Sequence, residues 1–328
     1  MSKNIFVFCE QRNGTLANVS LELLGVAKEL AEVTKEQVCA ILLGDNVKGL
    51  TKELISHGAD IVYLAQSRHL KYYLTEQYAQ AAGQIITQYQ PNIVLFPATS
   101  IGRDLAPRLS ARLRTGLTAD CTKLEADSEG NLFMTRPAFG GNLFATIICP
   151  DHRPQMSTVR PGVMKKLPAD ESRKGEIIEV DVKFNESKFL VTLAEEKIEK
   201  SEETSIEACK VLVSIGRGMM NNIEGARELA EQLGGGLSCS RAVVDSGVLP
   251  QPRQVGQTGK TVRPQLYLAM GVSGAVQHLA GMSDSEYIIA INKDKAATIF
   301  NVAHLAIVGD GAAILPYLKK EIEAVKAQ

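Results

Sequence analysis

The first third of the chain alternates short apolar runs with longer amphipathic segments. The apolar runs are rich in β-branched side chains, as in NIFVF at 4–8 and QVCAILL at 37–43, which is typical of buried strands. The segments between them, such as VSLELLGVAKELAEV at 19–33, space their apolar residues three and four apart, which predicts amphipathic helices. Strands that alternate with helices indicate a parallel sheet covered by helices.

From about residue 120 the pattern changes to short apolar stretches separated by the turn signals SEG at 128–130 and FGG at 139–141. These stretches are ADCTKLEAD (119–127), NLFMTRPA (131–138), NLFATIICP (142–150) and QMSTVRPGVM (155–164), and they predict antiparallel strands added to the first sheet. Weaker strand signals follow in EIIEVDVKF (176–184) and KFLVTLAEE (188–196).

A charged stretch without apolar periodicity comes next, and we place an inter-domain linker at 196–207. The alternation then restarts with strand-like runs such as LYLAM (266–270), YIIAIN (287–292) and HLAIVG (304–309). A chain of 328 residues is long for one core and suits two. We therefore predict an α/β protein with two doubly wound domains. The first is a Rossmann-like domain at 1–195 with added antiparallel strands, and the second is a parallel-sheet domain at 208–328.

Composition and charge exclude several classes of function. The 36 Lys and Arg residues balance 37 Asp and Glu, so no basic field attracts a nucleic acid. No apolar run reaches the ~18 residues of a membrane helix, and the N-terminus has neither a signal nor a transit pattern. The six cysteines form no CxxC pair and mostly sit in apolar runs, which predicts reduced thiols in a cytoplasmic protein, although a matrix protein whose presequence has been removed would look identical. The five histidines lack metal-ligand spacing, so we expect no metal site.

Candidate chemistry gathers after the strands of the second domain, because parallel sheets bind ligands beyond the carboxyl ends of their strands. In VLVSIGRG (211–218), Arg217 between two glycines can pair with a phosphate or form a plain turn with a solvated side chain. In SCSRAVVDSG (238–247), Ser240 and Arg241 follow a strand, and Arg241 can equally form a local ion pair with Asp245. The polar loop QVGQTGKTVRP (254–264) precedes a buried strand, and its Gln257 and Thr258 favour ligand contact.

The stretch GVSGAVQHLAG (271–281) follows the strand LYLAM. We expect Ser273 to be the N-cap of a helix whose small first residues let an anion approach its N-terminus. His278 then lies one and a half turns into that helix, either as a satisfied core histidine or as a ligand contact. Asn292 and Asp310 end two further strands, where a ribose or an adenine edge binds in nucleotide complexes.

Read together and in this order, these motifs resemble the alpha subunits of electron transfer flavoproteins. The matching text is SIGRG, SRAVVDSG, QVGQTGK, LYLAMGVSGAVQHLAGM, IIAINKD and IFNVAHLAIVGD, and the likeness continues more loosely through the first domain. The resemblance implies FAD in the C-terminal domain and an N-terminal domain that packs against a beta subunit, which holds AMP or a second FAD. It also implies electron transfer between an acyl-CoA-dehydrogenase-type partner and another redox centre, with no catalytic residue acting on a substrate.

Carried over position by position, the resemblance implies a set of FAD contacts. In that set Thr258 hydrogen-bonds the flavin N5, Arg241 lies against the isoalloxazine ring, and His278 lies near its pyrimidine end and favours the anionic reduced flavin. The helix after Ser273 supplies N–H groups for the pyrophosphate. The full set is Arg217, Ser240, Arg241, Val255, Gly256, Gln257, Thr258, Ser273, Gly274, Ala275, Val276, Gln277, His278, Asn292 and Asp310.

Two alternatives stay open at this point. The text TRPAFGGNLFATIICP with RPQM resembles alpha subunits of anaerobic bacteria, some of which act in flavin-based electron bifurcation. The chain would then be the electron-relay subunit of an NADH-oxidising complex. The other alternative is a non-redox nucleotide-binding or NAD-consuming module on the same domain type, which would be colourless.

Overall fold

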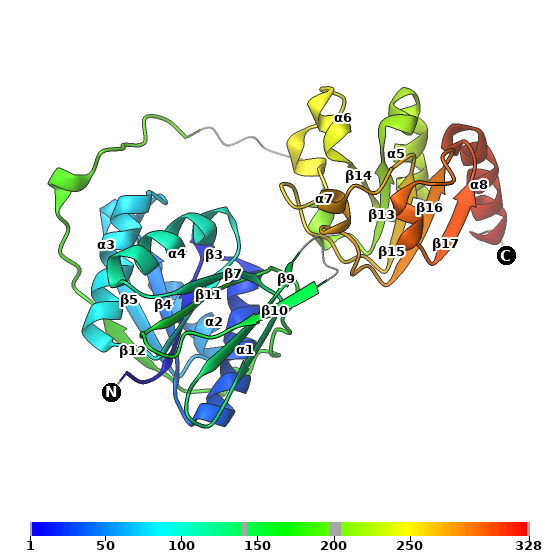
Figure 1. Cartoon of the computed structure of the whole chain (residues 1–328). Coiled ribbons are helices and arrows are strands. Elements are labelled where there is room, and N and C mark those ends of the chain that lie inside the picture. The colour runs from blue at the N-terminus through cyan, green and yellow to red at the C-terminus, as the bar shows by residue number, and fades with distance from the viewer. Residues whose placement is uncertain (1, 139–142, 197–204, 327–328) are drawn as a thin grey trace. The chain divides into compact units, whose positions relative to one another are not determined.

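The computed structural model describes residues 2–138, 143–196 and 205–326. The chain divides into two compact units, Met1–Glu196 and Lys197–Gln328, which are coloured along the chain in Figure 1. Most of the expected linker and the FGG turn signal lie outside the described residues. Among the helices of the described ranges, none has both the length and the apolar character needed to cross a membrane.

The first unit is built on a parallel sheet of seven strands. Every residue of β1, β4, β6 and β11 is buried, as expected for central parallel strands covered on both faces. In sheet order the strands are β12 (Glu176–Glu179), β5 (Ile61–Gln66), β4 (Val38–Gly44), β1 (Ile5–Cys9), β6 (Ile93–Pro97), β11 (Gln155–Val159) and β7 (Leu117–Cys121).

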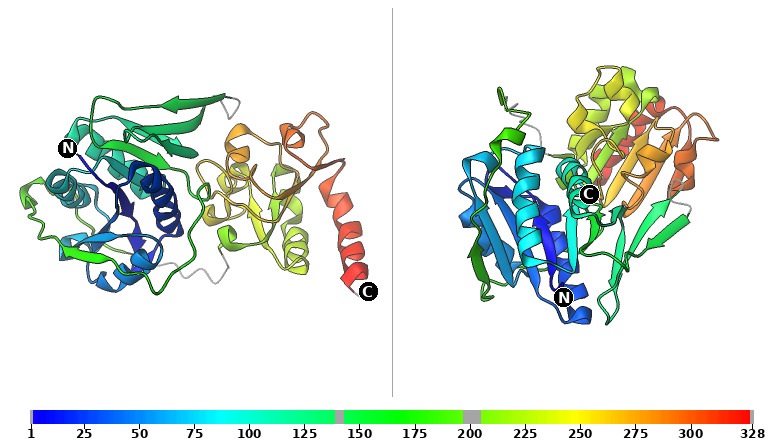
Figure 2. Two further views of the ribbon diagram at one scale, coloured as in Figure 1. Left: turned by 90° about the horizontal axis from the view of Figure 1, so that it is seen from below. Right: turned by 60° about the vertical axis from the view of Figure 1, so that its left-hand side comes forward.

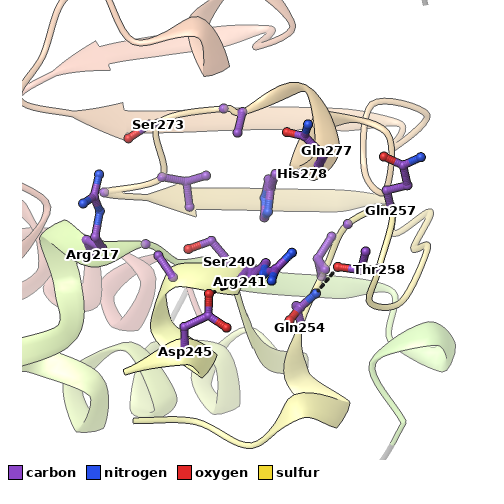
Figure 3. A pocket seen from close by; sticks show the side chains of 18 residues that line it. Arg217, Ser240, Arg241, Asp245, Gln254, Gln257, Thr258, Ser273, Gln277 and His278 are labelled. Atoms are coloured by element: carbon purple, nitrogen blue, oxygen red, sulfur yellow. Dashed lines mark hydrogen bonds and ion pairs between the residues drawn. The ribbon is translucent and has the colours of Figure 1, made fainter. Parts of the chain in front are cut away.

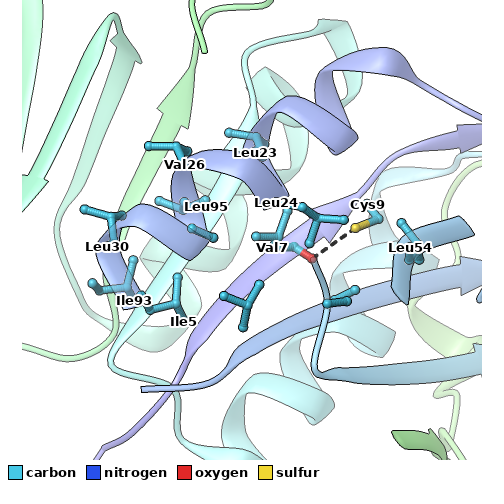
Figure 4. Packing of buried hydrophobic residues seen from close by; sticks show 14 of the residues in the cluster. Ile5, Val7, Cys9, Leu23, Leu24, Val26, Leu30, Leu54, Ile93 and Leu95 are labelled. Atoms are coloured by element: carbon cyan, nitrogen blue, oxygen red, sulfur yellow. Dashed lines mark hydrogen bonds between the residues drawn. The ribbon is translucent and has the colours of Figure 1, made fainter. Parts of the chain in front are cut away.

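Two pairs of helices cover this sheet. Alternate residues of β1 pack on opposite faces of the sheet, because successive side chains of a strand point to opposite sides. Ile5, Val7 and Cys9 join the apolar cluster of α1 (Asn18–Thr34) and α2 (Thr51–Ser56), shown in Figure 4. Phe6 and Phe8 join the cluster of α3 (Thr75–Tyr89) and α4 (Ser100–Leu113). The predicted alternation of strand and helix is therefore confirmed.

The expectation of four antiparallel strands after residue 120 is wrong in part. β11 pairs in parallel with β6 and β7 inside the main sheet, and the alternation of residues by itself does not encode strand direction. The antiparallel strands are β8 (Lys123–Ala126), β9 (Leu132–Ala138) and β10 (Leu143–Ile147), which form a separate sheet of three. Figures 1 and 2 show β9 and β10 extending away from the parallel strands of the same unit.

The smaller elements of the first unit complete its connections. The weak strand signal at 188–196 is wrong, because this segment pairs with no strand, and its Leu190 is 91% exposed. The remaining elements are the hairpin β2 (Gln11–Arg12) and β3 (Thr15–Leu16) and the 3-10 helices η1 (Lys48–Leu50), η2 (Arg68–Leu70) and η4 (Glu186–Lys188).

The second unit is a parallel sheet of five strands. In sheet order they are β14 (Gly236–Cys239), β13 (Val211–Ile215), β15 (Leu266–Met270), β16 (Tyr287–Asn292) and β17 (Leu305–Val308). One face packs against α5 (Ile223–Gln232), α6 (Arg241–Asp245) and α8 (Gly311–Lys326). Loops and short turns cover the other face, among them η5 (Ile206–Ala208), α7 (Val276–Leu279) and η8 (Thr298–Asn301).

The strand order of the second unit fixes where a ligand crevice opens. From β13 the chain passes to β14 on one side and later to β15 on the other, so β13 and β15 flank a topological switch point. In open parallel sheets the crevice lies beyond the carboxyl ends of such strands. The connections that leave these ends, η6 (Arg217–Asn222) after β13 and residues 271–275 after β15, therefore border the candidate site.

Candidate functional site

A pocket with a cavity volume of about 410 Å³ opens at this switch point (Figure 3). Its size falls within the ~300–1,000 Å³ range of small-molecule sites. It collects most of the predicted contact residues: Arg217, Ser240, Arg241, Val255, Gly256, Gln257, Thr258, Ser273, Gly274, Ala275, Gln277 and His278. We call it the switch-point pocket. The fold thus brings together four segments that are far apart in the sequence.

Glycines let the two central connections approach each other closely. A Cβ atom on Gly216 would overlap the carbonyl group of Gly271, so the backbones after β13 and β15 meet in direct contact. Any larger residue at position 216 would push these two segments apart. Both glycines line the switch-point pocket, so it is bordered at this point by backbone without side chains.

The loop at 254–260 forms one wall of the pocket. The buried amide of Gln254 donates to the Thr258 hydroxyl oxygen at 2.9 Å, which leaves the hydroxyl proton of Thr258 free to donate elsewhere. Gly256 has φ of 141°, which side-chain-bearing residues rarely adopt. The Gln257 N–H donates to the Gln277 carbonyl at 2.7 Å and so holds the loop against the segment that carries His278.

The expected helix after Ser273 is much shorter than its sequence suggests. α7 begins at Val276 and has four residues, its N-cap is Ala275, and no side chain caps it. Gly274 has φ of 86°, which interrupts helical backbone, and the Ser273 carbonyl accepts hydrogen bonds from η8 instead. The predictions of a Ser273 N-cap and of His278 one and a half turns into a helix are therefore wrong. The positive φ of Gly274 thus gives a non-helical turn in place of the first turn of the expected helix.

His278 is buried and also lines the pocket. Its Nε2 lies 3.0 Å from the Tyr267 hydroxyl. Its Nδ1 is buried and has no partner at hydrogen-bond geometry among the described residues. Burial lowers the pKa of His278 to about 4, and the backbone of Val255 beside the ring offsets this only in part. At neutral pH the imidazole ring is therefore uncharged, and its Nδ1 has no hydrogen-bond partner among the described residues.

The two arginines of the pocket differ in their partners. Arg241 forms an ion pair with Asp245, with 3.3 Å between Nε and Oδ2, and both side chains are mostly exposed. The local ion pair is thus present, and both residues still line the pocket. Arg217 is exposed, and within the part of the chain that the structure describes no partner for its guanidinium is found.

Three predicted contacts lie outside the pocket lining. Val276 is exposed on α7. The Asn292 amide donates to the Val272 carbonyl at 2.8 Å and so braces the backbone under the pocket. Asp310 is bound by Lys293 at 2.8 Å, and this hydrogen bond, with the backbone N–H of Ala312, lowers the pKa of its carboxyl. The structure therefore places Asn292 and Asp310 at strand ends beyond the pocket.

Sequence reasoning missed several lining residues: Gly216, Ala242, Asp245, Gln254, Gly271 and Val272. Most of them adjoin predicted contacts, and Gln254 opens the same polar loop. Their position in the sequence, next to predicted contacts, could have identified them. Only the structure gives Gly216, Gly271 and Gln254 a role, through the close approach of the two glycines and the hydrogen bond from Gln254 to Thr258.

No metal centre is found across the described ranges, since no three His, Cys, Asp or Glu side chains there are grouped to hold an ion. The cysteines are all free thiols.

Comparisons with known proteins match both units. The electron transfer flavoprotein domain matches residues 5–185, and the electron transfer flavoprotein FAD-binding domain matches residues 205–283. The chain is 51% identical over 326 residues to the electron transfer flavoprotein subunit alpha of Thermoanaerobacterium thermosaccharolyticum, with 99% of both chains covered. It is 49% identical to the subunit of the same name from Clostridium acetobutylicum, with 98% of this chain and 97% of that one covered.

A third relative has a more specific name. The acryloyl-CoA reductase electron transfer subunit beta of Anaerotignum propionicum is 42% identical over 354 aligned positions, with 99% of this chain and 96% of that one covered. These matches confirm the predicted family, the α/β architecture and FAD as the cofactor. The chain belongs to the alpha subunits of electron transfer flavoproteins, and its second unit is the FAD-binding domain of that family.

Proposed function

We propose that this alpha subunit, paired with a beta subunit, carries electrons on FAD between an acyl-CoA-dehydrogenase-type partner and another redox centre. The observation that carries the proposal is the switch-point pocket, whose lining combines glycine backbone, two arginines and a buried His278 nitrogen that has no hydrogen-bond partner among the described residues. A pocket of this kind suits the binding and tuning of a cofactor.

The chemistry of the donors fits FAD. The close approach of Gly216 and Gly271 suits a pyrophosphate, which needs backbone within reach. The buried Nδ1 of His278 and the free hydroxyl proton of Thr258 suit acceptor atoms on a flavin ring. When bound, FAD supplies an isoalloxazine ring that accepts and releases electrons.

Each side chain then has a defined task. Thr258 donates a hydrogen bond while Gln254 holds its oxygen, and neutral His278 donates without adding charge. Arg241 adds positive charge at the rim, partly offset by Asp245, and favours a reduced flavin that bears negative charge. The proposed contact set keeps its flanking members Val276, Asn292 and Asp310, which would meet the cofactor where it extends past the pocket lining.

The redox partner is proposed from chemistry. The relative named for acryloyl-CoA reductase serves an enzyme that saturates a carbon–carbon double bond next to a thioester. Acyl-CoA dehydrogenases run the same bond change in the opposite direction, so one class of partner covers both. We therefore propose an acyl-CoA-dehydrogenase-type enzyme as the donor or acceptor.

Members of the alpha subunit family pair with a beta subunit, and we propose that the first unit supplies the contact surface, with β10 at its centre. This edge strand exposes apolar side chains on both of its faces, and in Phe144 69% of the residue surface is exposed. Exposed apolar groups on an unpaired edge are typical of interaction sites. We expect Phe144→Asp to weaken heterodimer formation at least tenfold, since a carboxylate would be buried without a partner. Val325→Asp, at an exposed apolar position of α8, is the matched control.

Co-expression with the beta subunit tests the electron-carrier function. The complex should be yellow and release one FAD per alpha chain on denaturation. Addition of an acyl-CoA-dehydrogenase-type enzyme with its acyl-CoA should bleach the flavin. A flavin that stays oxidised while the dehydrogenase turns over with an artificial acceptor would contradict the proposal. Free cysteines throughout the chain support the cytoplasm as the proposed compartment.

The second candidate function is electron relay in an NADH-oxidising bifurcating complex. The anaerobe-type text around the β9–β10 hairpin and the relative named for acryloyl-CoA reductase favour it. It requires a second FAD in the beta subunit. NADH should then bleach the complex only when that second flavin is present, whereas a simple carrier shows no response to NADH.

A further inference from the structure

A group of buried polar side chains lies next to His278 on the loop-covered face of the second sheet. Tyr267 is fully buried, and its hydroxyl lies 3.0 Å from Nε2 of His278. Ser214 on β13 and Ser238 on β14 are fully buried opposite each other in the sheet register. Both serine hydroxyls lower the pKa of Tyr267, although neither reaches hydrogen-bond geometry. Four polar groups thus meet in an apolar surrounding.

The direction of the hydrogen bonds follows from what each group can donate. Burial raises the pKa of Tyr267, so the phenol keeps its proton. Neither serine hydroxyl has a hydrogen-bond partner within the described residues. A phenol donates more strongly than an imidazole N–H, and an imidazole nitrogen accepts more strongly than a phenolic oxygen, so Tyr267 directs its proton to Nε2 of His278. Nε2 is then the acceptor of the neutral ring.

A neutral imidazole carries one proton, so the ring proton must sit on Nδ1. This nitrogen is buried and lacks a partner at hydrogen-bond geometry in the described part of the chain, and its ring lines the switch-point pocket. A buried donor without an acceptor costs free energy, which a ligand acceptor at this position would recover.

We propose that Tyr267 is a positioning residue that fixes His278 in its Nδ1–H tautomer, so that Nδ1–H is the donor offered to the flavin. This inference rests on the proposed function, because it assigns the ring atom with which His278 meets the cofactor. Tyr267 itself does not line the pocket and acts only through His278.

Histidine-selective nitrogen-15 NMR of the FAD-loaded heterodimer tests the tautomer directly. Two histidines of the same chain serve as internal references. His304 Nδ1 accepts from the Ile288 N–H at 3.0 Å, so its proton is on Nε2. His57 Nδ1 lies 2.9 Å from the Glu53 carbonyl, so its proton is on Nδ1. We expect the His278 spectrum to resemble that of His57, and a spectrum like that of His304 would overturn the proposal.

Tyr267→Phe removes only the hydroxyl and should convert His278 to a mixture of tautomers. The dissociation constant for FAD should rise about fivefold, the effect of one hydrogen bond. Tyr287→Phe is the matched control, because Tyr287 stacks on His304, with ring centroids 5.0 Å apart, and does not line the switch-point pocket. An unchanged His278 tautomer in Tyr267→Phe would overturn the inference.

A second pair of variants keeps the test decisive if Tyr267→Phe does not fold. The amide nitrogen of asparagine substitutes for Nδ1 of histidine, and that of glutamine substitutes for Nε2. His278→Asn should therefore bind FAD more tightly than His278→Gln, and the reverse order would overturn the inference. A wild-type heterodimer that bleaches with the dehydrogenase while the tautomer result fails would refute only this inference. A heterodimer that never bleaches would refute the proposed function.

Discussion

Replacing Arg241 with alanine separates the role of this side chain in the pocket from any role in folding. Its only ion pair among the described residues joins it to Asp245 at 3.3 Å, with 69% and 62% of the two side chains exposed. Exposed pairs four residues apart in a helix contribute about 0.3–0.5 kcal/mol. The free energy of unfolding should therefore change by less than about 1 kcal/mol.

The effect on the flavin should be larger. Two unit charges 4 Å apart interact by about 1 kcal/mol in water and about 4 kcal/mol at an effective dielectric constant of 20. Because Arg241 is exposed, the lower value applies, and about 1 kcal/mol corresponds to about 40 mV in a one-electron step. Arg241→Ala should lower the flavin reduction potential by about this amount. Asp245→Asn removes the neighbouring negative charge and should raise the potential by a smaller amount.

Spectroelectrochemical titration of the heterodimer measures both shifts. Arg263→Ala is the matched control, because Arg263 forms a similar ion pair with Asp284 at 2.6 Å and does not line the pocket. The shifts should shrink at high salt, which screens exposed charges. Shifts of the same sign for Arg241→Ala and Asp245→Asn, or an unchanged potential with FAD still bound, would refute the reasoning.

Three further predictions concern other residues. Gln254→Leu breaks the 2.9 Å bond to Thr258, and calorimetric titration should show FAD affinity reduced about five- to tenfold. Gly216→Ala puts a methyl group against the carbonyl of the next connection and should cost about 1–3 kcal/mol in denaturant unfolding. Gly49→Ala, with open space around the new atom, should cost less than about 0.5 kcal/mol.

The third prediction concerns stability in acid. Desolvation raises the pKa of Glu76, but hydrogen bonds from two arginines of α4 and from a glutamine have the larger combined effect. The pKa of Glu76 is therefore lowered to about 2. The ionised carboxylate therefore stabilises the fold above its unfolded pKa near 4.5, and this contribution disappears as the pH falls toward 2. Acid unfolding of Glu76→Gln should lack that component, and identical pH profiles for variant and wild type would contradict the assignment.

The periodicity of apolar residues predicted most of the elements correctly. It located the strands NIFVF and LYLAM and the helix at 19–33, because burial on a sheet or helix face imposes a period on the sequence itself. It did not predict the parallel direction of β11, since the same residues satisfy either direction of pairing. Nor did it predict the loss of the first helical turn after Ser273, which depends on the backbone of Gly274 and its contact with η8.

For the candidate site, too, the sequence predicted some features and only the tertiary structure showed the others. The order of the strand-end motifs identified the family and most of the pocket residues, because side chains that follow parallel strands gather at one edge. The roles of Gln254 and Tyr267 came only from the tertiary structure. Their partners, Thr258 and His278, are set by loop and sheet geometry rather than by spacing. The neutral state of His278 is likewise a consequence of burial, which the sequence alone does not specify.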